Sequence, residues 1–491
     1  MQYILSIDQS TSATKAVLFN SRAQITASVS KEHLQYYPKP GWVEHDPEEI
    51  FTNTIGVINE ISRSNPDKRI SALAITNQRE TVVVWDSLTG KPVYNAIVWQ
   101  CNRGAERCKH LVDNGWNKIV RQKTGLLINP YFSATGISWI LDHVKGAREK
   151  ADKGELRFGT IDSWLIWKLT NGKVHATDHS NASRTMLFNI NTLAWDNEII
   201  TELGIPMSMA PMVQFADEKF GFTNINGILK KEVPITGVLG DSHAALFGQL
   251  CFEPGMGKAT YGTGSSIMMN IGSEPLESPE GLVTSVGYGM NGTVSYVFEG
   301  NIHCTGATIK WLQDDLQIIE NAAETEAIAQ QVSTNEGVYL VPAFAGLGAP
   351  YWNSEARAII CGMTRGSKKA HIVRAALEAI AYQVKDLVDL MIAKAGIPLK
   401  ELRVDGGPVK NNFLMQFQAD MLNATINRSN ISEASALGVA LVAGLSLGIW
   451  KTQEELGSLR VGNDYIVGSM ESIEIERLYE GWKDAVKKTI N

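Results

Sequence analysis

Four short segments of the chain carry residues that could bind phosphate or accept a proton. The first is residues 8–15, DQSTSATK, in which Asp8 ends an apolar run and small hydroxylated residues follow. A carboxylate at a strand end can hold Mg²⁺, and the amides and hydroxyls of such a turn can contact phosphate oxygens. Taken alone, the segment is also typical of an ordinary polar hairpin.

Two glycine-containing segments in the second half of the chain have a similar character. Residues 261–266, YGTGSS, place glycines on both sides of Thr263, so that backbone could approach a phosphate closely. Residues 404–408, VDGGP, end an apolar strand in Gly-Gly shortly before Asn411, and such a strand-to-helix turn can receive a nucleotide. This segment has no Rossmann GxGxxG, and the chain has no Walker GxxxxGK[ST] loop. Three weak sites in this order indicate a nucleotide cleft split between two lobes, of the actin, hsp70 and hexokinase type.

A candidate proton acceptor follows the apolar strand at Val238 and Leu239. Asp241 stands just past a glycine, where a carboxylate could take the proton of a substrate hydroxyl. His243 is the alternative base, although a histidine in a strand-to-helix turn is more often a hydrogen-bonded packing residue.

A last cluster of charged and aromatic residues is suited to bind vicinal hydroxyl groups. Arg79 and Glu80 follow an apolar strand ending at Ile75, and Trp99 and Tyr131 could pack aromatic faces against C–H edges. Each of the four is also compatible with a structural role, as a surface ion pair or as core aromatics.

Strands alternate with helices around these segments, which indicates an α/β architecture. We expect strands over 3–7, 16–19, 70–75 and 82–85, and helices over 47–62, 138–150, 162–170, 372–394 and 411–422. The strand–turn–strand pattern YILSIDQSTSATKAVLF recurs in the second half as GKATYGTGSSIMMNIG, without the acid. This echo predicts two related domains, residues 1–250 and 251–491, with a cleft between them where small molecules usually bind.

Composition narrows the class of protein. The 491 residues are too many for one ordinary core, and 44% apolar with 20% charged residues excludes disordered and fibrous classes. The net charge of −7, with no Lys/Arg block, gives no case for nucleic acid or for an anionic membrane as partner. Small molecules are therefore the expected partners.

Cysteine usage and apolar runs indicate a cytoplasmic globular protein. The five cysteines are scattered without a CxxC pair, which argues against a disulfide framework or a structural zinc site. The N-terminus reads as a strand and not as a signal peptide. The uncharged run 434–450 is short for a membrane span and rich in small residues, so we expect a closely packed buried helix in preference to a membrane helix.

Long blocks of the sequence resemble the FGGY family of carbohydrate kinases. The likeness runs in the family's order from the strand before Asp8 to about Trp450. The blocks are GWVEHDP (41–47), NQRETVVVWD (77–86), NAIVWQC (95–101), NPYFSAT (129–135), TDHSNASRTMLFNI (177–190), AALFGQ (244–249), VPAFAGLGAPYW (341–352), LRVDGGPVKNNFLMQFQAD (402–420) and ALGVALVAGL (436–445). The resemblance implies two ribonuclease-H-like domains that close over ATP and a polyol, with transfer of the γ-phosphoryl group to glycerol. It also implies a homo-oligomer, because relatives are often dimers or tetramers.

The resemblance also implies roles for individual residues. Asp8 would lie at the Mg²⁺, and the nucleotide would contact Thr11, Ser12, Ala13, Lys15, Thr263, Gly306, Lys310, Gly407 and Asn411. The polyol would contact Arg79, Glu80, Trp99, Tyr131, Asp241, Ser242 and Ser266, with Asp241 as the general base.

Departures from the family's pattern leave the substrate open. Ser242 and Ser266 stand where the family has a Gln and a Phe that touch glycerol, and Lys15 and Lys310 replace an Arg and a Gln. Replacing Phe by Ser gives up roughly 1.5–3 kcal/mol of apolar contact if the site is buried. Two serines leave more room and two extra hydroxyls, so a longer polyol or ketose, such as a tetritol, xylulose or ribulose, is the alternative substrate.

Two other functions are compatible with such a fold. A non-enzymatic nucleotide switch and a plain ATPase or phosphatase would both lack a specific polyol site. The presence of Arg79, Glu80, Trp99, Tyr131 and Asp241 favours a polyol kinase over either of them.

Overall fold

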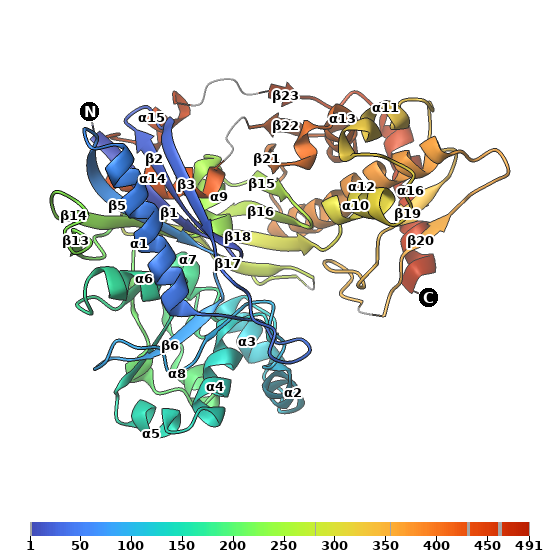
Figure 1. The fold of residues 1–491 in the computed structure, drawn as a ribbon. Coiled ribbons are helices and arrows are strands. Elements are labelled where there is room, and N and C mark those ends of the chain that lie inside the picture. The colour runs from blue at the N-terminus through green and yellow to red at the C-terminus, as the bar shows by residue number, and fades with distance from the viewer. Residues whose placement is uncertain (1, 280, 354, 430–432, 460–463, 491) are drawn as a thin grey trace.

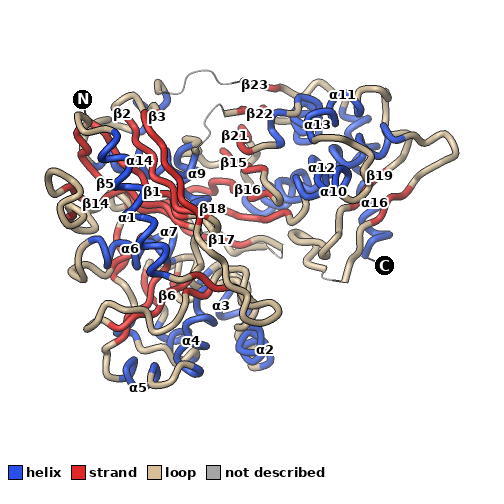
Figure 2. Tube along the Cα trace, viewed as in Figure 1, coloured by secondary structure: helices blue, strands red, loops and turns tan. Residues whose placement is uncertain are grey.

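Two mixed β-sheets, one in each half of the chain, form the centres of two lobes (Figure 1). The structure is a computed structural model, and it describes residues 2–279, 281–353, 355–429, 433–459 and 464–490. The first sheet has the strand order β13-β14-β5-β1-β2-β3, and the second has the order β17-β18-β16-β15-β21-β22-β23. Helices surround the sheets in both lobes (Figure 2).

The first sheet combines antiparallel and parallel pairing. Its strands are β1 (Gln2–Gln9), β2 (Ala13–Asn20), β3 (Ile25–Glu32), β5 (Arg69–Asn77), β13 (Phe222–Thr223) and β14 (Val233–Gly240). Strands β1, β2 and β3 pair antiparallel, whereas β1 pairs parallel with β5, and β5 parallel with β14. Leu5, Ile7, Leu73 and Ile75 are fully buried on this sheet, and each such burial contributes roughly 1.5–3 kcal/mol.

The second sheet repeats this arrangement. Its strands are β15 (Met256–Tyr261), β16 (Ser265–Gly272), β17 (Val283–Met290), β18 (Thr293–Ile302), β21 (Glu401–Gly406), β22 (Thr425–Arg428) and β23 (Asp464–Ile466). Strands β15, β16 and β18 pair antiparallel, and β15, β21 and β22 pair parallel. The order β18-β16-β15-β21-β22 therefore matches β3-β2-β1-β5-β14, which confirms the predicted repeat and the predicted α/β fold class of two ribonuclease-H-like domains.

Smaller sheets complete the molecule. A four-stranded sheet with the order β4-β7-β6-β8 extends the first lobe and packs against the helices α2 to α5. Its strands are β4 (Glu44–His45), β6 (Val82–Asp86), β7 (Ala96–Ile97) and β8 (Leu156–Thr160). Three two-stranded sheets contain β9 (Ala176–Asp178) with β12 (Met212–Gln214), β10 (Phe188–Asn189) with β11 (Ala194–Trp195), and β19 (Tyr339–Val341) with β20 (Ile359–Cys361).

The predicted helices are found in the structure in all but one place, and further helices lie between them. They are α1 (Pro47–Ser64), α2 (Ala105–Asp113), α3 (Asn117–Thr124), α4 (Ser133–His143), α5 (Ala147–Asp152), α6 (Ile161–Leu169), α7 (His179–Ala182), α8 (Asn197–Glu202), α9 (Asp241–Gly248), α10 (Gly306–Asp314), α11 (Thr325–Ala329), α12 (Lys369–Ala395), α13 (Asn412–Leu422), α14 (Ala434–Ser446), α15 (Gln453–Gly457) and α16 (Ser472–Ile490). The prediction of one helix over 138–150 is wrong. Val144 is extended and Gly146 adopts a φ of +79°, so the segment divides into α4 and α5.

Helix α14 comes from the second half of the chain but packs on the first lobe (Figure 1). It contacts α9 and strands β1, β5 and β14 of the first sheet. Glycines make this approach possible, because a side chain at Gly438 would collide with the carbonyl of Ala244, and one at Gly248 with that of Ala434. The predicted closely packed helix is thus confirmed. Across the described residues, no helix has the length and apolar character that crossing a bilayer requires.

Candidate active site

A cavity of about 870 Å³ lies between the two lobes. Asp8 and Ala245 line it from the first half of the chain, and Thr260, Asp405 and Gly407 line it from the second. The cavity therefore brings together two of the segments that the sequence predicted as phosphate or nucleotide sites.

Asp8 lies close to two other acidic residues, Asp241 and Glu433. It ends β1, and loss of hydration raises its pKa to about 7, with further contributions from the charges of Asp241 and Glu433. Lys15 faces Asp8 across the hairpin, but its ammonium pairs with Glu433, with Nζ 2.7 Å from Oε1. A carboxylate in such a setting is suited to hold a divalent cation, whose charge would favour its ionised form.

The tip of the first hairpin is tied to the aromatic pair. Nε1 of Trp99 donates a 3.0 Å hydrogen bond to Oγ1 of Thr11, and the rings of Trp99 and Tyr131 meet edge to face with centroids 5.4 Å apart. The carbonyl of Ser12 accepts a 3.1 Å hydrogen bond from the amide of His33, and the carbonyl of Ala13 accepts one of 2.9 Å from Ser10. The hairpin after Asp8 and the aromatic pair of Trp99 and Tyr131 are thus one connected structure.

The second hairpin is joined to the start of α10. The amide of Gly306 donates to the carbonyl of Gly262 at 2.9 Å, and the amide of Ala307 donates to that of Thr263 at 3.0 Å. A Cβ atom at Gly306 would lie 2.6 Å from the oxygen of Gly262, so only glycine fits there. The sequence prediction that Thr263 and Gly306 belong to one site is consistent with this contact.

Two of the expected nucleotide residues lie farther out. The side chain of Lys310 is 77% exposed and its ammonium lies 3.7 Å from Asp314, so it sits at the protein surface. Asn411 caps α13 by accepting a 2.9 Å hydrogen bond from the amide of Leu414, and its amide group donates to Thr325 at 3.0 Å. Neither residue lines the cavity, although Lys410 and Asn412 do.

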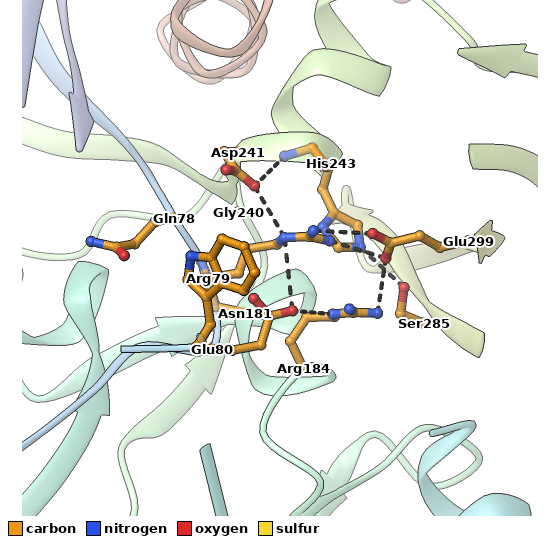
Figure 3. Close-up of polar contacts among 12 residues, drawn as sticks. Gln78, Arg79, Glu80, Asn181, Arg184, Gly240, Asp241, His243, Ser285 and Glu299 are labelled. Carbon is orange, nitrogen blue, oxygen red and sulfur yellow. Dashed lines mark hydrogen bonds and ion pairs between the residues drawn. The ribbon is translucent and has the colours of Figure 1, made fainter. Parts of the chain in front are cut away.

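Arg79 is at the centre of a buried network of charges next to this cavity (Figure 3). Its Nη1 and Nη2 atoms each donate a 3.0 Å hydrogen bond to Glu299, and its Nε lies 3.0 Å from Oδ1 of Asp241. Arg184 completes the network, with Nε donating to Glu80 at 2.6 Å and Nη1 lying 2.8 Å from Glu299. Two arginines and three carboxylates are therefore fixed in one geometry.

Sequence reasoning missed Arg184 and Glu299. Both are buried, and although burial acts to raise the pKa of Glu299, Arg184 and Arg79 hold it well below its ordinary value. Burial raises the pKa of Glu80, against the opposing charges of both arginines. The signal that could have revealed Glu299 is a single acid inside the apolar strand YVFEGNI.

The backbone that carries Arg79 and Glu80 is strained. The two residues follow β5 with φ values of +59° and +25°, which residues other than glycine rarely adopt. Ser133 stabilises the turn by donating a 2.7 Å hydrogen bond to the carbonyl of Glu80. One carboxylate oxygen of Glu80, Oε2, is buried without a hydrogen-bond partner among the described residues, which makes it available to a ligand hydroxyl.

Asp241 is the first residue of α9, directly after β14. Its Oδ1 accepts a 2.6 Å hydrogen bond from the amide of Ser242, and its carbonyl accepts one of 2.9 Å from Ser435, which lines the cavity. Its side chain is 36% exposed, and its charge contributes to the raised pKa of Asp8. A carboxylate thus stands close to the candidate cation ligand.

His243 and the two serines lie on either side of this carboxylate. His243 is fully buried, its Nε2 lies 3.1 Å from Oγ of Ser285, and burial holds its pKa well below the ordinary value. These contacts favour a packing role for it over that of a base. The hydroxyls of Ser242 and Ser266 lie 3.4 Å apart, so the two positions that depart from the family's pattern are neighbours in space.

Comparison with known proteins agrees with this geometry. Sequence models of the N-terminal and C-terminal domains of the FGGY family of carbohydrate kinases match residues 3–248 and 257–447. A glycerol kinase from Petrotoga mobilis is 54% identical and glycerol kinase 2 from Thermotoga maritima is 53% identical, each over 100% of this chain and 99% of the relative. The crystal structure of Plasmodium falciparum glycerol kinase with ADP superposes with a TM-score of 0.96 at 39% identity, over 100% of this chain and 99% of that one. The chain therefore belongs to the FGGY family of carbohydrate kinases.

Proposed function

We propose that this protein is a glycerol kinase, which transfers the γ-phosphoryl group of ATP to glycerol to form glycerol 3-phosphate. Full-length relatives of that name support the assignment. The observation that carries it is the position of Asp241, which lies 3.0 Å from Arg79 and close enough to Asp8 to affect its pKa. An alcohol acceptor and a nucleotide phosphate could meet at this place.

The charge network would hold the acceptor. Arg79 would donate to one hydroxyl of the polyol, and the unsatisfied Oε2 of Glu80 would accept from another. The edge-to-face pair of Trp99 and Tyr131 would pack against the C–H edges of the carbon chain. A rigid network of this kind orients a small flexible acceptor, which is a large part of the work in phosphoryl transfer.

Asp241 would accept the hydroxyl proton as the new P–O bond forms. The transition state of phosphoryl transfer is loose, so little base strength is needed and orientation matters more. Arg79 and the amide of Ser242 both contact Oδ1, which fixes the plane of the carboxylate and leaves Oδ2 for the acceptor.

Asp8 would hold Mg²⁺ together with phosphate oxygens and water. No group of three or more His, Cys, Asp or Glu side chains is placed to hold a metal within the described ranges, which fits the preference of Mg²⁺ for few protein ligands. The bound ion neutralises charge on the nucleotide phosphates. Lys15 would contact phosphate only after its ion pair with Glu433 opens.

The nucleotide would lie along the second lobe. We assign its phosphates to the turn residues Thr11, Ser12 and Ala13 and to Thr263 and Gly306, and its adenosine to Gly407 and Asn411, with Lys310 at the outer rim. Gly407 supports the assignment because it lines the cavity together with Asp8.

A longer polyol or ketose remains the second candidate substrate. The observation that favours it is the pair of small hydroxylated side chains, Ser242 and Ser266, beside Asp241. A coupled assay of ADP release distinguishes the possibilities. Release that depends on glycerol supports glycerol kinase, and release that depends on a longer polyol or ketose supports the second candidate. Release without any acceptor indicates an ATPase, and the absence of release with all of these acceptors indicates a nucleotide switch.

We further propose a cytoplasmic homo-oligomer, a dimer or a tetramer, with the domain division at residues 1–250 and 251–491. The fold repeat supports the division, although α14 crosses back to the first lobe. Light scattering coupled to size-exclusion chromatography would measure the oligomeric state.

A further inference from the structure

Lys258 is a buried cation that the roles above do not use. It lies on β15 and is 1% exposed, and burial lowers the pKa of its ammonium, an effect that the charges of Asp405 and Glu299 oppose. In the part of the chain that the structure describes, no carboxylate lies within ion-pairing distance of its Nζ. A buried ammonium without a direct counter-ion is costly, so its position calls for a reason.

The ammonium contacts two hydroxyls of the second hairpin. Nζ donates to Oγ1 of Thr260 and to Oγ of Ser266, each at 3.3 Å. Thr260 and Ser266 are direct partners in the β15–β16 ladder, so their side chains lie on the same face of the sheet as Lys258. All three residues therefore point to one side of the hairpin.

The hydroxyl of Thr260 lies on the nucleotide side of the proposed reaction centre, and that of Ser266 lies on the acceptor side. Thr260 lines the cavity that Asp8 also lines. The hydroxyl of Ser266 lies 3.4 Å from that of Ser242, the residue after Asp241. Lys258 is thus linked through one hydroxyl to the nucleotide side and through the other to the acceptor side.

Hydrogen bonding from the ammonium determines what the hydroxyls can do. A hydroxyl carries one proton and two lone pairs, so a hydroxyl that accepts from Lys258 keeps its own proton for a partner in another direction. A proton kept in this way by Thr260 can point into the cavity that this residue lines, and one kept by Ser266 can point toward Ser242. Donors fixed in this way are suited to stabilise charge that develops on a transferring group.

The other cations near the centre are already neutralised. Arg79 contacts Glu299 and Asp241, Arg184 contacts Glu80 and Glu299, and Lys15 pairs with Glu433. Their charge is therefore largely used by the protein, whereas the hydrogen bonds that the described residues show for the Lys258 ammonium go to neutral hydroxyls.

We propose that Lys258 is a positioning residue for phosphoryl transfer, which orients the hydroxyls of Thr260 and Ser266 toward the phosphoryl group as it moves from ATP to the acceptor. This inference rests on the proposed kinase function. In the step concerned, the bond from the acceptor oxygen to the γ-phosphorus forms, the bond to the β–γ bridging oxygen breaks, and the hydroxyl proton goes to Asp241. The two O–H donors bind the equatorial phosphoryl oxygens during this exchange.

Lys258→Met tests the proposal, because methionine keeps most of the side-chain volume and removes the charge. We expect kcat with glycerol to fall by roughly tenfold to a hundredfold, less than the roughly 10²–10³-fold for direct loss of a preorganised donor, because Lys258 acts through the two hydroxyls. The affinity for ADP alone, measured by calorimetry, should stay within about threefold, because ADP lacks the γ-phosphoryl group that these donors would contact. Lys258→Arg should restore part of kcat.

If the Lys258→Met variant does not fold, the variants Thr260→Val and Ser266→Ala test the proposal in its place. Each should lower kcat alone, and the double variant should lower it by less than the product of the two, because both act through one ammonium. An unchanged kcat in these variants, or a loss of ADP affinity equal to the loss of kcat, would overturn the proposal. Wild-type enzyme without glycerol-dependent turnover would instead overturn the proposed function and this inference with it.

Discussion

The Nε atom of Arg79 lies 3.0 Å from Oδ1 of Asp241, so the guanidinium that anchors Glu299 also orients the proposed base. The amide of Ser242 contacts the same oxygen at 2.6 Å. Among the described residues, none donates a hydrogen bond to Oδ2. In the proposed mechanism Arg79 thus orients both the acceptor and Asp241, and Glu299 of the second lobe's sheet holds Arg79 in place.

Substituting the proposed base, Asp241, should affect catalysis but not nucleotide binding. We expect Asp241→Asn to lower kcat by about 10²–10⁴-fold, because the proton acceptor is lost. ADP should still bind with wild-type affinity in calorimetry, since the assigned nucleotide contacts remain. The matched control is His243→Gln, which should keep most of the turnover if His243 only packs against Ser285. The reverse pattern, with the Asp241→Asn variant active and the His243→Gln variant inactive, would make the histidine the base.

The two serines beside Asp241 should set the length of the acceptor. Steady-state kinetics with glycerol, erythritol, threitol, xylulose and ribulose should give glycerol the highest kcat/KM. Ser266→Phe should widen the preference for glycerol over the tetritols by roughly 10–200-fold, the range that one carbon unit commands in a pocket. Glycerol trailing a longer acceptor by about tenfold, a difference of about 1.4 kcal/mol, would make the longer compound the substrate.

Breaking the charge network should destabilise the protein. Glu299→Gln leaves Arg79 and Arg184 without their shared carboxylate, and loss of one partner of a buried ion pair costs about 3–5 kcal/mol. Denaturant unfolding measures the change. Glu480→Gln is the control, because the pair of Glu480 with Lys483 is exposed and worth about 0–1 kcal/mol.

The same variant has a predictable pH dependence. The arginines depress the pKa of Glu299 below the ordinary value of 4.5, so its contribution is complete above that value and is lost as the pH falls. The stability difference between wild type and Glu299→Gln should therefore be constant from neutral pH down to about 5 and shrink at more acidic pH. A difference that grew on acidification would contradict the ionised state of Glu299.

The contact between Gly306 and Gly262 should matter for the nucleotide. In Gly306→Ala the new methyl group lies too close to the carbonyl of Gly262, so the second hairpin must move. We expect the KM for ATP to rise by about tenfold or more, with a smaller change in the KM for glycerol. Gly457→Ala, at a position with open space around it, should leave both constants unchanged.

Local patterns predicted much of this architecture. The strand–turn–strand segments around Asp8 and Thr263 were recognisable because alternation and turn residues are encoded within a few positions. The helix over 138–150 was not, because Val144 and Gly146 interrupt a continuous helical pattern. A helix often tolerates an isolated Gly inside such a pattern, so the sequence around Gly146 does not by itself indicate that the helix ends there.

The site was harder to predict than the fold. Arg184 and Lys258 look like ordinary charged residues in the sequence, and their burial follows from strands and loops that meet only in the folded chain. Lys310, which the resemblance assigned to the nucleotide, has its side chain at the surface, and its contact with the nucleotide stays a prediction.

Helix α14 also has a consequence for fragments of this protein. It covers part of the first sheet although in the chain it follows the strands β15 to β22 of the second sheet. A polypeptide released early, at residue 250, would expose bare apolar surface on α9 and β5, and it should aggregate or be degraded. A premature stop codon anywhere before position 434 should therefore leave neither half of the protein in a functional form. Two co-expressed fragments could complement each other only if the fragment that contains α14 supplied this helix to the first lobe.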